Sequence, residues 1–354
     1  MSEKSESAEI ESRALGHYLG KFLPGSPETI FVKSHVAGAS NLTYFVSFGG
    51  AEMVLRRPPL GDLLPTAHDV EREYKFIDAL YGRARVPKPI HMCTDKTIIG
   101  APFYLMHRVM GEIMRDAIPS SCDSLEGRSA FSEEMIDALV ELHSVEWQST
   151  SLIGKPDGYL KRQLRRWTGQ WALTRSTARS LDGLDKAAAW LSDNLPPDNV
   201  ATVVHGDYKP DNVIFSAEDP KLIAVLDWEM ATIGDPLADL GWLLSYWGDP
   251  GDPFPFPDYV PEGYPSPFNT NNRLTAEKGF PDHETLISMY ERKSGRTVKY
   301  LDFYIIFSVF KLSVILEGLY MQYLEQTAVN PQNARYEWEV PLLVDRLQRL
   351  ISAT

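Results

Sequence analysis

The sequence predicts an α+β fold in two lobes, a small and mostly antiparallel β lobe over residues 1–107 and a larger, mostly helical lobe over residues 108–354. Short apolar stretches with period-two alternation and turn glycines occur early in the chain, whereas apolar residues at helical spacing dominate after residue 108. The chain of 354 residues is also 44% hydrophobic, which is enough to bury a large core in one two-lobed domain or in two domains.

The first elements are expected to be a helix and a β-hairpin. Residues 10–23 have helical spacing and end at a Pro-Gly stop signal. Residues 30–32 and 42–48 are predicted strands, and a Gly-Gly pair then supplies the positive φ that a tight hairpin needs before a strand at residues 53–56.

A further helix and strand complete the predicted small lobe. Residues 68–80 have apolar positions near helical spacing, and the Pro-rich run at residues 86–89 ends that element. Residues 98–106 are predicted as a strand that leads into the larger lobe.

The larger lobe is predicted to be helical except near its middle. The apolar runs at residues 201–204, 213–215 and 222–226 are expected to be strands, the last two joined by a turn. Residues 249–281 contain eight prolines and are predicted to form a long loop without a regular helix, acting as a substrate-side lid. Helices are expected at residues 131–147, 157–178, 184–195, 284–293, 299–325 and 336–351.

One stretch among these strands carries the chemistry. It reads His-Gly-Asp-Tyr-Lys-Pro-Asp-Asn, with its first Asp at Asp207 and its Asn at Asn212, and Asp227 follows fifteen residues later. This pattern is typical of phosphoryl-transfer enzymes, in which the Asp takes the proton of the acceptor hydroxyl and the Asn binds a metal. The hairpin that joins Asn212 to Asp227 would place the two side by side, as a shared Mg²⁺ requires. Asp207 is therefore the predicted base, and Asn212 and Asp227 are the predicted metal ligands.

The chain resembles the aminoglycoside phosphotransferase family, relatives of the protein kinases that phosphorylate small molecules. The resemblance rests on this stretch, on the Asp-Trp-Glu that begins at Asp227, and on a Gly-Asp-Pro-Leu-Ala-Asp-Leu run that contains Asp239. It covers about residues 28–325 and implies a protein-kinase-like fold that uses ATP and Mg²⁺. It further implies that Lys209 steadies the transferred group and that Asp239 holds the catalytic loop through backbone N–H groups.

The resemblance also implies a nucleotide site in the small lobe. The loop over residues 38–43 occupies the place of the loop that covers the phosphates, which makes Ser40 and Asn41 candidate contacts, although a plain hairpin turn would look the same. The backbone around Met106 to Arg108 occupies the place of the hinge that bonds the adenine edge.

The third strand departs from the kinase pattern, because Arg56 stands where a Lys is expected to bind the phosphates. Arg keeps the charge and can hold an anion bidentately. Glu73 on the next helix is predicted to orient Arg56 by an ion pair, with Glu71 as the alternative, and Arg57 is expected on the opposite face of the strand. An Arg at this position resembles the branch of kinase domains fused to acyl-CoA dehydrogenases, although a solvated surface Arg is the other interpretation.

Charge and composition restrict the partners. Lys plus Arg is 35 and Asp plus Glu is 48, which gives a net charge of −13 and argues against nucleic acid. The N-terminus lacks the apolar core of a signal peptide, and the apolar segment 303–316 is short and interrupted by Lys311, so no membrane partner is expected. Cys93 and Cys122 are predicted to be ordinary thiols in a reducing cytoplasm.

The sequence thus predicts an enzyme that moves the γ-phosphoryl group of ATP to a hydroxyl of a small molecule. Aromatic residues are frequent after Asp239, which suits a hydrophobic or acyl-bearing alcohol better than a sugar polycation. Together with what the Arg56 resemblance implies, this favours a hydroxylated metabolite such as a hydroxyacyl thioester over an aminoglycoside. A catalytically silent nucleotide-binding or scaffold protein is the alternative, and the sequence carries no signal of oligomeric state.

The polar residues on two predicted helices of the larger lobe, 157–178 and 299–325, each have two open interpretations. The Arg and Trp residues of 157–178 could contact an anionic substrate or form a solvated helix face. His143 is expected to be a packed core residue rather than a base. The polar positions on the apolar helix 299–325 could line the acceptor pocket or bond backbone and water; they are Tyr304, Lys311, Glu317 and Gln322.

Overall fold

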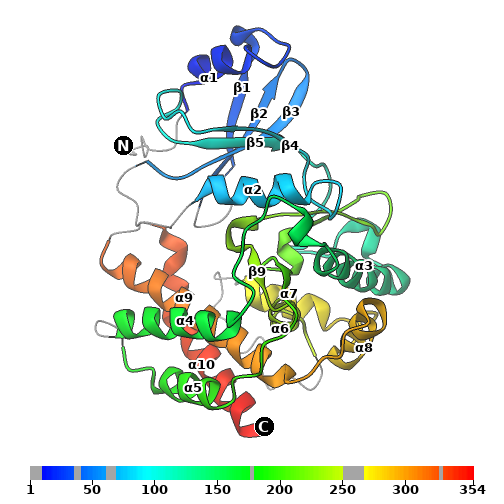
Figure 1. Ribbon diagram of the computed structural model, residues 1–354, viewed down its shortest axis with the longest axis vertical. Coiled ribbons are helices and arrows are strands. Elements are labelled where there is room, and N and C mark those ends of the chain that lie inside the picture. The colour runs from blue at the N-terminus through cyan, green and yellow to red at the C-terminus, as the bar shows by residue number, and fades with distance from the viewer. Residues whose placement is uncertain (1–9, 36–40, 61–68, 176–178, 250–266, 327–329) are drawn as a thin grey trace.

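The chain folds into a small lobe built on a β-sheet and a larger helical lobe, as Figure 1 shows for the computed structural model. The structure describes residues 10–35, 41–60, 69–175, 179–249, 267–326 and 330–354. The C-terminus lies at the end of the helical lobe farthest from the sheet. The predicted two-lobed α+β fold is confirmed.

The small lobe contains one five-stranded sheet with the strand order β1-β2-β3-β5-β4, in which all neighbours are antiparallel. Gly49 and Gly50 join β2 to β3 with φ of 58° and 82°, the left-handed conformation that a two-residue hairpin requires. The elements are α1 (Ser12–Leu19), β1 (Phe31–His35), β2 (Leu42–Phe48), β3 (Ala51–Arg57), α2 (Val70–Leu80), β4 (Pro89–Cys93) and β5 (Phe103–His107), with a 3₁₀ turn at Pro27–Thr29.

Two strands of this sheet correct the predictions. β4 is not among the predicted strands, because the Pro-rich run at residues 86–89 indicates only the end of the preceding helix. It is an edge strand that begins at Pro89, where a missing N–H leaves the ladder intact. β5 begins at Phe103 rather than at residue 98, because Gly100 turns the chain with a φ of 83°.

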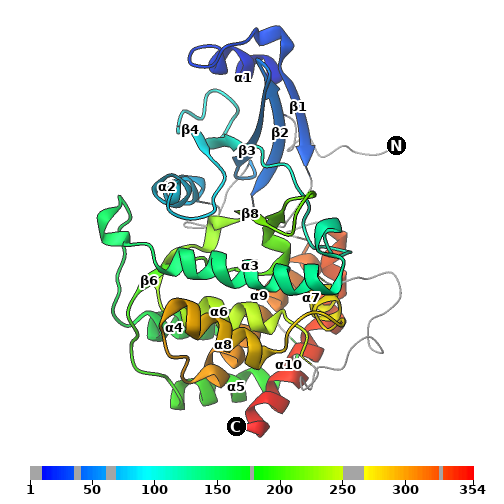
Figure 2. The ribbon, with the colours of Figure 1, turned by 90° about the vertical axis from the view of Figure 1, so that its right-hand side faces the viewer.

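The two faces of the sheet contribute to different hydrophobic cores. Met53 and Leu55 pack with α1 on one face. Val54 and Met106 face the other way, into a core shared with α2 and with the helical lobe. Figure 2 shows α2 between the sheet and that lobe. Since the sheet shares this core, the division of the chain at residue 107 stays a prediction, although β5 ends there.

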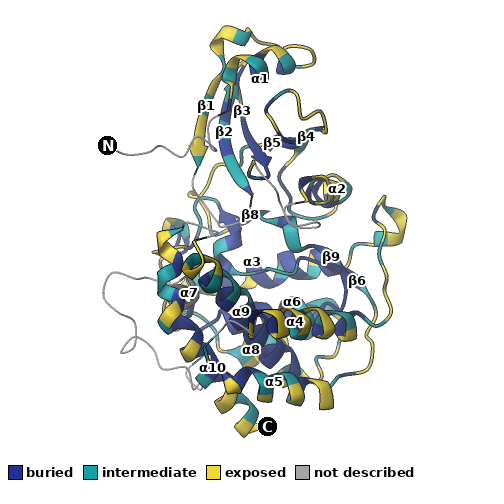
Figure 3. Ribbon diagram, turned by 90° about the vertical axis from the view of Figure 1, so that its left-hand side faces the viewer, coloured by how far each residue is buried: buried dark blue, intermediate teal, exposed yellow. Residues whose placement is uncertain are grey.

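The helical lobe is organised around α9 (Leu301–Leu324), which is buried along most of its length (Figure 3). This helix is long and apolar enough to cross a membrane by length and composition alone, but 78% of its most apolar stretch is buried inside the protein, as in a core helix. Its companions are α3 (Leu125–His143), α4 (Tyr159–Arg175), α5 (Asp182–Asp193), α6 (Leu237–Ser245), α7 (Pro267–Thr275), α8 (His283–Ser294) and α10 (Tyr336–Ala353), with 3₁₀ turns at Ser120–Cys122, Trp147–Ser149, Pro210–Asn212, Trp228–Met230 and Pro331–Arg335.

Two pairs of short strands lie between α5 and α6 along the chain. The predicted hairpin is formed by β7 (Val213–Phe215) and β8 (Leu222–Val225), and the Leu226 N–H extends it by donating to the Asn212 carbonyl at 2.8 Å. The predicted strand β6 (Thr202–Val204) pairs with the unpredicted β9 (Thr232–Gly234). The hairpin therefore places Asn212 beside Asp227.

The Pro-rich segment differs from its prediction where it is described. Residues 250–266 lie outside the described part of the chain, so the proposed lid stays a prediction. Pro267, however, begins α7, which makes the prediction of an irregular loop wrong for Pro267–Thr275. A proline is well accommodated in the first turn, because the N–H that it lacks has no helical partner there.

Candidate active site

The loop over residues 205–212, the predicted catalytic loop, is anchored by the buried carboxylate of Asp239 on α6. Its Oδ2 accepts the His205 backbone N–H at 2.6 Å, and its Oδ1 accepts the Gly206 N–H at 2.7 Å, so the predicted anchoring is present. Burial alone would raise the pKa of Asp239, but hydrogen bonds and nearby imidazoles, His143 above all, lower that pKa below its usual value. Asp239 therefore stays ionised and holds the loop as a double acceptor.

His205 ties this loop to the strand that precedes Asp227. Its Nε2 lies 2.8 Å from the Leu226 carbonyl oxygen, so Nε2 carries the proton and donates it. Its Nδ1 then accepts the Asp207 backbone N–H at 3.2 Å. The imidazole thus fixes the backbone of Asp207 relative to Asp227.

The carboxylate of Asp207 is held by donors on both oxygens. Oδ2 accepts the Asn212 side-chain amide at 2.7 Å, and Oδ1 accepts the Trp242 indole N–H at 2.8 Å. Lys209 Nζ lies 3.3 Å from Oδ1. The structure thus brings the predicted residues Asp207, Lys209 and Asn212 together, and it adds Trp242, which the sequence analysis missed.

Lys209 is surrounded by acceptors. Besides Asp207, its Nζ lies 3.8 Å from Asp211 and 5.1 Å from the centre of the Tyr246 ring. Burial would lower the pKa of Lys209, but Asp207 and Asp211 raise it well above its usual value. Asp211 also accepts the Asn271 amide of α7 at 3.1 Å, so α7 supports this side of the loop.

Arg56 joins the two lobes at the nucleotide side of the site. Its Nη1 lies 2.9 Å from Glu73 Oε1, which is the predicted ion pair. Nη1 and Nη2 also each donate to Asp227 Oδ1 at 3.0 Å. Glu71 is exposed, so the alternative partner is wrong. Arg56 is itself only 9% exposed, which excludes a solvated surface Arg.

The neighbouring predictions have mixed outcomes. Arg57 lies on the opposite face of β3, as expected, and donates to the Tyr44 hydroxyl at 3.0 Å. Asn41 is buried and donates to Glu73 at 3.3 Å, directly behind the ion pair. Ser40 lies outside the described residues. Nucleotide contacts of Ser40 and Asn41 therefore stay predictions.

Asp227 has the conformation of a functional residue. Its φ of 65° is left-handed, a region that Asp tolerates better than most residues but that still costs free energy. Burial alone would raise the pKa of Asp227, but the Arg56 guanidinium beside it lowers the pKa below its usual value. Asp227 is therefore an ionised carboxylate directed into the site.

The oxygens of Asp227 and Asn212 fit a magnesium site. Arg56 uses only Oδ1 of Asp227, and no donor from the described residues contacts Oδ2. Asn212 Nδ2 donates to Asp207, so the amide oxygen of Asn212 points away from Asp207 and can serve as a metal ligand. The described residues contain no cluster of three or more His, Cys, Asp or Glu side chains placed to hold a metal. Two protein ligands suit Mg²⁺ bound with a nucleotide, because phosphates and water complete its shell.

The predicted hinge is partly used by the sheet. The His107 N–H donates to the Lys88 carbonyl at 2.9 Å, and the Arg108 N–H donates to the Glu52 carbonyl at 3.1 Å. The Arg108 guanidinium stacks over Phe45 at 4.0 Å. Met106 is paired with Val54 inside the sheet, so the adenine contacts of Met106 and Arg108 stay predictions.

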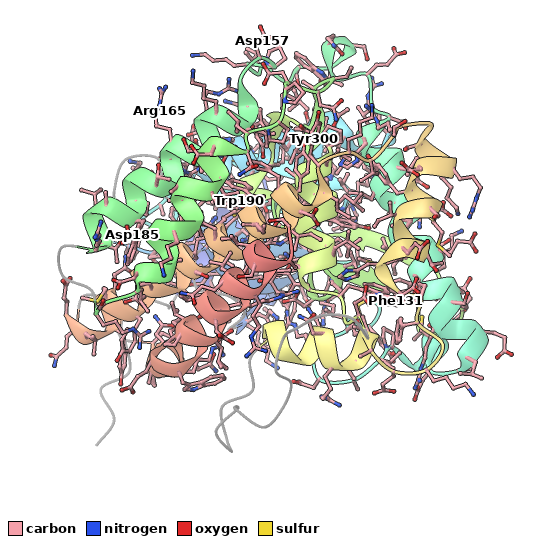
Figure 4. The ribbon with its side chains drawn as sticks, turned by 90° about the horizontal axis from the view of Figure 1, so that it is seen from below. Phe131, Asp157, Arg165, Asp185, Trp190 and Tyr300 are labelled. Atoms are coloured by element: carbon pink, nitrogen blue, oxygen red, sulfur yellow. The ribbon has the colours of Figure 1, made fainter. Side chains whose placement is uncertain are left out.

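The Arg and Trp residues of α4 separate onto two faces. Trp167 and Trp171 are buried, whereas Arg165 and Arg166 are exposed. Figure 4 shows Arg165 pointing outward from the helix. Exposed arginines fit both predicted interpretations, so the choice between a substrate contact and a solvated helix face stays open.

The polar positions of α9 bond within the protein. Tyr304 donates to Asp235 at 2.7 Å, Lys311 donates to the Gly206 carbonyl at 2.6 Å, and Glu317 pairs with Arg179 at 3.0 Å. Gln322 is exposed. Described aromatic residues counted toward an acceptor pocket, such as Tyr290, Phe303 and Phe310, are buried core residues. The aromatic argument for the acceptor is therefore weaker than predicted.

His143 is a core residue, as predicted, but it also supports the site, and Trp242 is a site residue that the sequence did not predict. His143 is buried, with Nε2 3.3 Å from Asp239 and Nδ1 2.9 Å from the Tyr290 hydroxyl, so it is a core residue that supports the loop anchor. Trp242 follows Asp239 by three residues on α6. The i, i+3 spacing places the two on one helix face, which was a usable signal that Trp242 lies at the loop.

The contacts of Arg56 predict a graded response to substitution. Arg56→Ala should lower kcat/KM for ATP by roughly 100-fold or more, because it removes the charge and leaves Glu73 and Asp227 without it. Arg56→Lys should fall between wild type and Ala, at roughly tenfold, because it keeps the charge but cannot bridge both carboxylates. Steady-state kinetics with thermal unfolding of each variant measures this. Equal losses of kcat/KM in the two variants would show that the bidentate geometry of the guanidinium matters more than its charge. Unchanged kinetics in both would show that Arg56 does not belong to the nucleotide site.

Known proteins resemble this chain in sequence and in fold. A model of the phosphotransferase enzyme family matches residues 32–263. Acyl-CoA dehydrogenase family member 11 from Gallus gallus is 35% identical over 333 residues, which covers 91% of this chain and 41% of that protein. The chain thus spans less than half the length of this relative.

Solved structures give the same picture. A candidate aminoglycoside phosphotransferase from Ralstonia eutropha has a TM-score of 0.76 at 28% identity, covering 97% of this chain and 99% of that chain. An aminoglycoside phosphotransferase in a ternary complex with AMP-PNP and hygromycin B has a TM-score of 0.57 at 15% identity, covering 96% and 98%. At that identity, the second likeness shows the fold alone.

Proposed function

Because the chain belongs to the phosphotransferase enzyme family, we propose that it transfers the γ-phosphoryl group of ATP, with Mg²⁺, to a hydroxyl of a small molecule. The observation that carries the proposal is the Asp207 carboxylate, fixed between Asn212 and Trp242 with Lys209 beside it. A fixed carboxylate next to an ammonium group is what general-base transfer of a phosphoryl group needs.

Each residue has a distinct role in this proposal. Asp207 accepts the proton of the acceptor hydroxyl, and Lys209 balances the charge of the transferred group. Arg56, held by Glu73, binds the phosphates that precede that group. Asn212 and Asp227 would hold Mg²⁺, which supplies neutralisation of phosphate charge when bound.

The proposed acceptor is a hydroxylated metabolite such as a hydroxyacyl thioester. The relative at 35% identity is named for the acyl-CoA dehydrogenase family, which supports an acyl thioester acceptor.

The test is an ADP-release assay over a panel of acceptors. Hydroxyacyl-CoA compounds of several chain lengths and kanamycin-type aminoglycosides are compared at equal concentrations, with the Asp207→Asn variant as the blank. We expect ADP release and a phosphorylated product, detected by mass spectrometry, with hydroxyacyl compounds alone.

Other outcomes separate the alternatives. If kanamycin-type compounds were phosphorylated efficiently and hydroxyacyl compounds were not phosphorylated at all, the proposed acceptor class would be overturned. No turnover with any acceptor, together with tight binding of Mg²⁺-ATP in calorimetry, would instead favour a catalytically silent nucleotide-binding protein. The proposed cytoplasmic location is checked separately by fractionation.

A further inference from the structure

Trp242 is in an unusual position for a buried tryptophan, because its polar atom bonds to the proposed base. The indole Nε1 lies 2.8 Å from Asp207 Oδ1, whereas the ring is only 4% exposed. A buried indole N–H needs one acceptor, and an ionised carboxylate is a strong one. The contact fixes the orientation of the Asp207 carboxylate from the side opposite Asn212.

Lys311 on α9 lies against the same indole. Its Nζ is 4.0 Å from the centre of the Trp242 ring and donates to the Gly206 carbonyl at 2.6 Å. Burial lowers the pKa of Lys311 to about 8, although Asp207 and Asp239 oppose that change. The ammonium therefore stays mostly protonated at pH 7, where it binds both the ring face and the backbone that precedes Asp207.

We propose that Trp242 and Lys311 are positioning residues for the proposed reaction: the indole N–H aims the Asp207 carboxylate at the acceptor hydroxyl, and Lys311 holds the indole and the Gly206 carbonyl in place. The effect on kcat rests on the proposed function. The hydrogen bond from Trp242 to Asp207 does not, because it can be observed without turnover.

The chain offers a matched control for Trp242. Trp247 is also fully buried, and its indole N–H donates to the Pro281 carbonyl at 2.9 Å, away from Asp207. Trp242→Phe and Trp247→Phe each remove one buried indole hydrogen bond while keeping an aromatic ring. Only the first removes a donor to the base.

The kinetic test compares the two variants. Trp242→Phe should lower kcat by roughly 10- to 100-fold with KM for ATP nearly unchanged, because misaimed catalytic groups slow the chemical step. Trp247→Phe should keep kcat within about threefold of wild type even where it lowers the melting temperature, since its hydrogen bond is only structural. Equal losses of kcat in both variants would overturn the positioning role.

A spectroscopic test needs no turnover. In protein with ¹⁵N-labelled tryptophan, the Trp242 indole N–H resonance should shift on Asp207→Asn and on Lys311→Met, whereas the Trp247 resonance stays in place. An unchanged Trp242 resonance in Asp207→Asn would overturn the inference. Inactivity of wild type toward every acceptor would count against the proposed function, while this resonance would still decide whether the contact exists.

Discussion

Asp207→Asn is expected to lower kcat by about 10³-fold, because it removes the group that accepts the hydroxyl proton. Asn has nearly the same shape, but it cannot take a proton at neutral pH. Affinity for Mg²⁺-ATP should stay within a few fold, since Asp207 acts on the acceptor rather than on the nucleotide. Single-turnover phosphoryl transfer and nucleotide titration by calorimetry measure the two quantities separately.

The controls for this variant follow from its contacts. Asn212 and Trp242 both donate to Asp207, so a melting curve must show that the loop remains folded. Asp219→Asn, an exposed change in the β7–β8 turn, controls for the loss of one negative charge. A comparable loss of nucleotide affinity in Asp207→Asn would contradict its role as a base.

Asp227→Ala is expected to weaken Mg²⁺-nucleotide binding by roughly 100-fold and to remove measurable turnover, because an essential metal ligand is lost. Among the residues that the structure describes, the variant also leaves Arg56 with Glu73 as its one remaining ion-pair partner. Calorimetric titration of ADP with and without Mg²⁺ separates the two effects. Loss of a metal ligand reduces only the Mg²⁺-dependent part of the affinity.

Backbone strain complicates this substitution, and a second variant corrects for it. Asp227 has a φ of 65°, which Asn accepts more readily than Ala does. Asp227→Asn should therefore show the metal effect with less change in folding stability. If Mg²⁺ dependence were unchanged in Asp227→Asn and Asp227→Ala alike, Asp227 would not be a metal ligand.

Local sequence patterns predicted much of the fold and of the site. The hairpin from β7 to β8 follows from apolar runs and a turn, and it was enough to place Asn212 beside Asp227. The Arg56 to Glu73 ion pair followed from strand and helix order in the resemblance. Each of these needed only neighbouring elements of the chain.

Contacts between elements far apart in the sequence could not be predicted from local sequence patterns. Trp242 lies 35 residues from Asp207, and Lys311 lies 105 residues from Gly206, so both contacts depend on how α6 and α9 pack. The bond from Arg56 to Asp227 depends on how the two lobes meet. β9 and β4 were missed for a related reason, because short strands are stabilised by their partners rather than by their own sequences.

The junction of Arg56 with Asp227 also bears on how the protein responds to ionic strength. Arg56 belongs to the small lobe, and its side chain is only 10% exposed where it meets Asp227 of the hairpin below. Dissolved ions screen charges in open solvent strongly and partly buried charges much less. Added salt should thus weaken exposed pairs such as Arg349 with Asp345 while it leaves this junction in place. This contact between the two lobes should therefore respond less to the salt concentration of the medium than the exposed pairs do, and the hydrophobic core that the sheet shares with the helical lobe supports it.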